Sequence, residues 1–120
     1  MLITTAMEKM IDFYKGNTHD INHFLKVWAF AKTIGEAEGL DKETQEILEL
    51  AAVVHDISCP LCREKYGNAD GRHQILLEAD FLVNADEGGY SKEAIENACR
   101  NIFRTDTGIR LLKSIYLEEK

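Results

Sequence analysis

Four side chains that can bind a divalent metal ion lie in three separate segments of the 120-residue chain: His23, the adjacent pair His55 and Asp56, and Asp80. Imidazole and carboxylate ligands together suit Mn²⁺, Fe²⁺, Mg²⁺, Ni²⁺ or Zn²⁺, and they leave coordination positions for water and substrate. A bound divalent ion acidifies its water and neutralises charge on a phosphoryl oxygen, as phosphoester hydrolysis requires. These four residues are therefore the candidate metal ligands.

The pair His55 and Asp56 stands at the end of the apolar run "AAVVHDIS", residues 51–58. The helix that carries it is apolar on every side, and burial of two ionisable groups without partners is costly. The alternative to a metal-binding role for this pair is a hydrogen-bonded helix end that faces solvent. The same dipeptide at His19 and Asp20 has a simpler interpretation, because it lies at a helix start where an aspartate complements the helix dipole.

His23 and Asp80 each have a structural alternative as well. His23 belongs to an apolar stripe with helical spacing and so can face the interior of a bundle, where a histidine is often only a hydrogen-bonded core side chain. Asp80 lies within "ILLEADFLV" and could belong instead to a polar strip with His73 and Asn84. Periodicity does not decide between these interpretations.

The elements that must position these residues are all predicted to be helices, because apolar residues recur at helical spacing and no alternating strand pattern is present. We expect helices over residues 2–14, from a cap at Asn17 or Thr18 to Gly39, and over 41–56, 72–87, 90–103 and 105–117, with a loop over 57–71 that contains the single proline. The third of these helices belongs at the centre of the bundle, since it is apolar all round from Ile47 onward.

Composition favours one all-α domain over residues 1–120 in a soluble, cytoplasmic protein. No apolar run approaches the length of a membrane span, and the first residues carry Glu8 and Lys9 where a signal peptide needs an apolar centre. The net charge of −7 argues against nucleic-acid polymers and anionic membranes as partners, but it leaves a small phosphate ligand open. Cys59 and Cys62 are too close together to staple a fold, which fits a reducing compartment.

The candidate ligands resemble the motif of the HD-domain phosphohydrolases, all-helical metal enzymes with a histidine, then a His-Asp pair, then a distant aspartate. His23 followed by "FLKV" is similar to the family's first histidine with its basic residue three positions on, here Lys26. "AAVVHDI" is similar to the His-Asp helix, and Asp80 in "LLEADFLVN" to the last aspartate. The resemblance covers most of residues 17–117, and 74–112 are similar to small bacterial members in particular.

The resemblance implies an HD-like helical bundle in which His23, His55, Asp56 and Asp80 hold the metal and Lys26 helps to hold substrate phosphate. Asp56, beside the water, would orient it or take its proton. We therefore predict a metal-dependent phosphohydrolase that acts on a nucleotide or another small phosphoester. The alternative is a catalytically impaired HD-like domain that serves as a binding or assembly module.

This chain departs from the family between Asp56 and Asp80, where other members usually place a longer, mostly helical stretch. Without this stretch, the apolar helix faces that it would bury must be buried by something else. We expect a second copy of the chain to bury them in a homodimer, and the two chains could exchange their C-terminal helices.

The sequence "CPLC" in the expected loop has the spacing of a zinc knuckle that only His73 and Cys99 could complete. A reactive thiol or two inert cysteines are the other interpretations.

Overall fold

The computed structural model describes the backbone of residues 2–66 and 72–117, together with their side chains except those of residues 55–66, 72 and 73. Every element in these ranges is helical, so the all-α prediction is confirmed. The helices are α1 (Leu2–Phe13), α2 (Thr18–Ala37), α3 (Lys42–Tyr66), α4 (Arg72–Gly88), α5 (Lys92–Asn101) and α6 (Asp106–Leu112), and the π-helix η1 (Lys113–Leu117) follows α6 directly. Within the described ranges, no helix combines the length and apolar character needed to cross a membrane.

Side-chain caps fix where four of the helices begin, because each cap accepts a hydrogen bond from a backbone N–H that the first turn leaves without a helical partner. The capping residues are Asn17, Asp41, Ser91 and Thr105. Gly16 and Gly39 follow the ends of α1 and α2 with φ angles of 85° and 82°, which glycine adopts without strain. The helix boundaries expected around these residues are confirmed.

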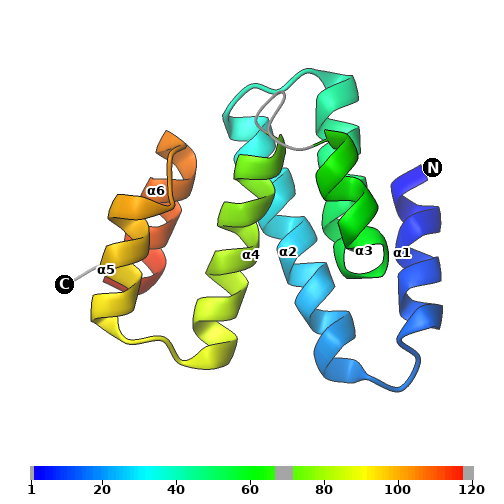
Figure 1. The fold of residues 1–120 in the computed structure, drawn as a ribbon, viewed down its shortest axis with the longest axis horizontal. Helices are drawn as coiled ribbons and strands as arrows, with labels where there is room; N and C mark the ends of the chain where they lie inside the picture. Colours follow the sequence, from blue (N-terminus) through cyan, green and yellow to red (C-terminus); the bar gives the residue numbers. More distant parts are fainter. Residues whose placement is uncertain (1, 67–71, 118–120) are drawn as a thin grey trace.

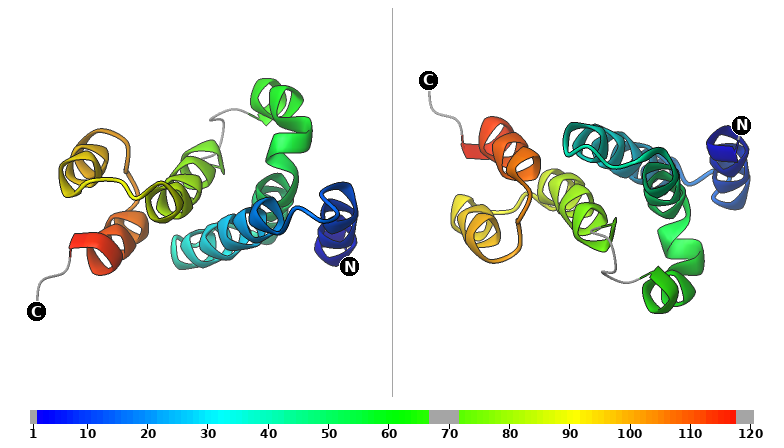
Figure 2. Two further views of the ribbon diagram at one scale, coloured as in Figure 1. Left: turned by 90° about the horizontal axis from the view of Figure 1, so that it is seen from below. Right: turned by 90° about the horizontal axis from the view of Figure 1, so that it is seen from above.

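Helices α2, α3 and α4 enclose the main core. Its members with no exposed surface include Val27, Ala31, Leu48, Ala52 and Ala79. Three fully buried members, Ala31, Ala52 and Ala79, are alanines, and small side chains let neighbouring helices approach closely. Figure 1 shows α2 and α4 side by side with opposite chain directions, and in Figure 2 α4 lies between α2 on one side and the pair α5 and α6 on the other.

A second buried cluster attaches α1 to the outside of this arrangement. It joins Ala6 and Met10 of α1 to Phe24 of α2 and Val53 of α3. Met10, Phe24 and Val53 are almost completely buried. The cluster therefore fixes α3 beside the first turns of α2, where His23 is located.

The expected loop over residues 57–71 is wrong in its first part, because α3 continues as a helix to Tyr66. The expected loop rests in part on Pro60, but a proline removes only one backbone hydrogen bond, and the residues after it, "LCREK", include strong helix formers. The ribbon of α3 changes direction within its second half (Figure 2), as helices commonly do at a proline. The rest of the expected loop, residues 67–71, lies outside the described residues.

The C-terminal helices are held to the core by Glu78 of α4, whose side chain is completely buried. Its carboxylate accepts hydrogen bonds from four groups: Gln74 Nε2, the backbone N–H groups of Arg104 and Thr105, and the Thr105 hydroxyl. Because both oxygens of the carboxylate accept hydrogen bonds, the cost of removing its charge from water is offset. The start of α6 is thereby fixed against α4, and η1 follows it along the same helix.

Candidate functional site

His23 of α2 lies between two carboxylates of α4. Its Nε2 is 3.2 Å from Asp80 Oδ1, and its Nδ1 is 2.9 Å from Glu87 Oε1. The side chains of His23 and Glu87 are only 14% and 15% exposed, whereas that of Asp80 is 33% exposed. His23 thus points from α2 toward α4 and lies close to Asp80, while the role of either residue as a metal ligand stays a prediction.

Helical spacing explains how α4 presents this polar face. Asp80, Asn84 and Glu87 follow one another at intervals of four and three residues, which places them on one side of the helix. Asn84 Nδ2 donates to Asp80 Oδ2 at 3.0 Å, so the carboxylate is oriented with Oδ1 toward His23. Asp80 and Asn84, two members of the alternative polar strip, therefore contact each other on the side of α4 that faces α2, whereas the side chain of the third member, His73, lies outside the described residues.

Glu87 was missed by sequence reasoning. It lies in "NADEGG", where a charged residue near a helix end suggests a solvated surface. Its position could have indicated its role, because Glu87 lies seven residues, or two helical turns, after Asp80 and therefore on the same face of the helix.

The two carboxylates raise the pKa of His23 from its ordinary value of 6.5 to about 8. The hydrogen-bonding contact with Asp80 contributes most, burial opposes the rise, and the hydrogen bond and negative charge of Glu87 add to it. At neutral pH the metal-free imidazole is thus mostly protonated and can donate from both nitrogens.

The same geometry fits a divalent metal ion. When Nδ1–H donates to Glu87, the lone pair of Nε2 is available on the side of Asp80, and a carboxylate that orients a ligating histidine in this way is a common feature of metal sites. Two donors bound to one ion at right angles, each at about 2.1 Å, lie about 3 Å apart. The 3.2 Å separation of Nε2 and Asp80 Oδ1 is close to that value, and it is equally the separation of an ion pair between a protonated imidazole and a carboxylate.

His23 and Asp80 supply two donors, and a metal site of the predicted kind needs more. Among the described side chains, no group of three or more histidine, cysteine or acidic residues is arranged to hold an ion. The helix α3 includes residues 55 and 56, but the side chains of His55 and Asp56 lie outside the described residues. Their roles as ligands stay predictions.

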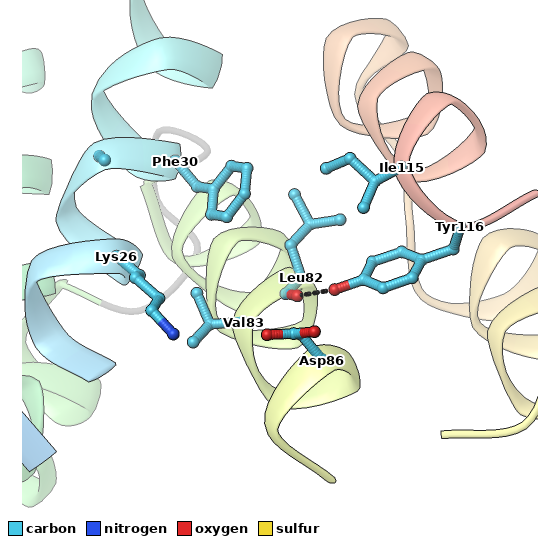
Figure 3. A pocket seen from close by; sticks show the side chains of 8 residues that line it. Lys26, Phe30, Leu82, Val83, Asp86, Ile115 and Tyr116 are labelled. Carbon is cyan, nitrogen blue, oxygen red and sulfur yellow. Dashed lines mark hydrogen bonds between the residues drawn. The ribbon is translucent and has the colours of Figure 1, made fainter. Parts of the chain in front are cut away.

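Lys26 lies one helical turn after His23 and is exposed. It borders a groove of about 410 Å³ between α2, α4 and η1, whose lining also includes Phe30, Leu82, Val83 and Tyr116 (Figure 3). His23 and Asp80 do not line this groove. Whether Lys26 contacts a phosphate stays a prediction.

The residues given simpler interpretations behave accordingly where the structure describes them. Asn17 rather than Thr18 caps α2, and its side chain exchanges hydrogen bonds with Asp20. His19 is 72% exposed and lies 3.9 Å from Glu87 Oε1 at its nearest approach to that carboxylate. Cys99 is partly buried in α5 against the main core.

The side chains of the other members of the possible zinc knuckle, Cys59, Cys62 and His73, are not described. Comparisons of the chain with protein-family models, with curated proteins and with solved structures found no match.

Proposed function

We propose that this protein is a metal-dependent phosphohydrolase of the HD type that acts on a nucleotide or another small phosphoester. The supporting observation is the 3.2 Å approach of His23 Nε2 to Asp80 Oδ1 while Glu87 holds Nδ1 at 2.9 Å. Two donors from different helices share the separation expected of neighbouring ligands, and a third residue sets the tautomer that one of them needs.

In this proposal His23, His55, Asp56 and Asp80 hold a divalent ion such as Mn²⁺, Fe²⁺, Mg²⁺, Ni²⁺ or Zn²⁺. When bound, such an ion supplies Lewis acidity and neutralises phosphoryl charge. Asp56 orients the attacking water or takes its proton, and Glu87 keeps the His23 ring in place.

Lys26 attracts the substrate phosphate from its position one turn beyond His23. With the covering stretch between Asp56 and Asp80 shortened, we expect weak substrate binding. A high KM with a measurable kcat is the corresponding kinetic signature.

A binding or assembly module is the second candidate. The same contact without a metal favours it, because a protonated His23 between the carboxylates of Asp80 and Glu87 forms ion pairs that join α2 to α4. Metal content alone does not separate the two candidates, since a module could retain the ion. Turnover separates them.

The test combines elemental analysis with a hydrolysis panel. We expect about one divalent ion per chain, lost in His55→Ala and Asp56→Ala because each removes a donor. We also expect slow hydrolysis of nucleoside monophosphates or an aryl phosphate with Mn²⁺, Ni²⁺ or Mg²⁺, which Asp56→Ala abolishes and Lys26→Ala weakens. His19→Ala is the matched control and changes neither result. A metal-loaded protein without turnover over the whole panel would favour the module.

We also propose that the chain forms a homodimer. The helix α1 exposes three large apolar side chains in the single chain, Leu2 at 54%, Ile11 at 39% and Phe13 at 65%. Apolar surface of this kind is commonly covered by a symmetric partner. Light scattering over micromolar concentrations gives the mass directly, and a constant monomeric mass would contradict the proposal.

A further inference from the structure

The groove that Lys26 borders has an apolar body. Leu82 and Val83 of α4 form its floor, and Phe30 of α2 faces Ile115 and Tyr116 of η1 across it (Figure 3). Its volume of about 410 Å³ falls within the range of small-molecule sites. The groove can therefore take a ligand about the size of one or two rings.

Tyr116 is fixed as one wall of the groove. Its hydroxyl donates a hydrogen bond to the backbone carbonyl of Leu82, which ties η1 to α4. Burial raises the pKa of the Tyr116 phenol, and the negative charge of Asp86 adds to the rise, so the hydroxyl stays a neutral donor. A fixed aromatic wall opposite Phe30 favours a flat aromatic ligand, because offset or edge-to-face ring contacts add to the apolar burial.

The polar groups of the groove are gathered at one end. Figure 3 shows the Lys26 amine and the Asp86 carboxylate there, while Phe30 and Ile115 lie at the other end. Of the ion pairs in the described part of the chain, none joins Lys26 to Asp86. The ammonium group therefore offers donors to a ligand, and the carboxylate beside it offers acceptors.

We propose that this groove is a binding site for a flat aromatic ring whose polar edge carries a hydrogen-bond acceptor and a donor side by side, as a primary carboxamide or the amide edge of a heterocyclic base does. The acceptor faces Lys26 and the donor faces Asp86, while the ring lies between Phe30 and Tyr116. A ligand with a net charge at this edge is bound less well, because one of the two side chains has the same sign.

This site is separate from the His23 and Asp80 contact, since neither residue lines the groove. Binding here does not require the metal or any hydrolytic activity. The inference can thus be tested on the metal-free protein. Lys26 is shared with the proposed phosphate contact, but the groove test measures neither metal content nor turnover, so either proposal can fail without the other.

The test is an NMR titration of chelator-treated protein with labelled Ile, Leu and Val methyl groups. The probes are benzamide, benzoate and benzylamine, which share a ring and differ in the charge of the polar edge. We expect saturable shifts of the Leu82, Val83 and Ile115 methyl groups with benzamide, and binding at least threefold tighter than that of either charged probe. No saturable shift at these methyl groups, or equal binding of all three probes, would overturn the proposal.

Variants assign the two polar contacts. Lys26→Met should remove the preference for benzamide over benzylamine, and Asp86→Asn should remove the preference for benzamide over benzoate. Ile115→Glu places a charge at the apolar end of the groove and should weaken benzamide at least fivefold. Because Ile115 is 47% exposed, this variant is expected to fold. Leu77→Ala, an exposed position on α4 outside the groove, is the control, and an equal loss of binding in it would count against the site.

Discussion

His23 Nδ1 lies 2.9 Å from Glu87 Oε1, although 64 positions separate these two residues in the chain. The contact joins the first turns of α2 to the last turns of α4, and both side chains are largely buried. If Nε2 binds a metal ion, as proposed, Glu87 accepts the hydrogen bond that the remaining Nδ1–H donates. The properties of Glu87 should therefore be visible in metal binding, although this residue need not touch an ion.

Glu87→Gln should weaken divalent metal binding about 10- to 100-fold, as loss of a carboxylate behind a ligating histidine typically does. The amide side chain can still reach His23, but it is a weaker acceptor and carries no charge to stabilise the bound state. Calorimetric titration with Mn²⁺ measures the change. Asp86→Asn removes the same charge one position earlier and serves as the control. Equal weakening in both variants would mean that only the net charge matters.

The raised pKa of His23 predicts a specific pH dependence of stability in the metal-free protein. Because the folded value of about 8 exceeds the ordinary 6.5, protonated His23 stabilises the fold, and this contribution is complete below pH 6.5 and lost as the pH rises through about 8. The loss should be on the order of 1 to 2 kcal/mol in the free energy of unfolding.

Urea unfolding of chelator-treated protein at several pH values checks this prediction, with His23→Gln as the comparison. The wild type should lose stability relative to the variant between pH 6.5 and about 8, and NMR titration of the ring should give the same pKa. A parallel pH dependence in both proteins would show that His23 does not carry the effect.

Much of the fold follows from local chemistry. Asn17, Asp41 and the glycines after α1 and α2 mark helix ends through interactions that need only neighbouring residues, and these boundaries could be predicted. The continuation of α3 past Pro60 could not, because whether a helix survives a proline depends on the residues that follow it and on packing.

The candidate site likewise has a part that the sequence predicts and a part that it does not. His23 lies on the apolar face of α2, which periodicity can direct toward the interior, and its proximity to Asp80 follows once α2 and α4 are neighbours. Periodicity alone left open whether Asp80 belongs to a surface strip. The burial of Glu78 had no comparable signal. Three of its four hydrogen-bond donors belong to residues 104 and 105, and two of them are backbone N–H groups, which leave no trace in the pattern of side chains.

Glu78→Ala should destabilise the protein by about 3 kcal/mol or more, because it leaves several buried donors without an acceptor and opens a cavity. Glu78→Gln should cost less, since its carbonyl oxygen can accept from Gln74 and the two backbone N–H groups while its NH₂ group faces the Thr105 hydroxyl, which can also accept. Urea unfolding followed by circular dichroism gives the free energy. The exposed Glu46→Gln, also within a helix, is the matched control and should lie within about 0.5 kcal/mol of the wild type.

Gly108→Ala tests how tightly the start of α6 is held against α4. A Cβ atom at Gly108 would lie 2.0 Å from Glu78 Oε1 and 2.8 Å from Thr105 Oγ1. The Glu78 carboxylate cannot move aside without losing its hydrogen bonds. Without this clash, alanine in a helix would stabilise the protein by about 1 kcal/mol relative to glycine. We therefore expect the opposite sign, a loss of about 2 kcal/mol or more in the free energy of unfolding.

The double variant with Glu78→Ala should lose clearly less than the sum of the two single losses, because the truncated side chain leaves room for the methyl group. An additive double variant, or a stabilised Gly108→Ala protein, would contradict the close contact of α6 with Glu78.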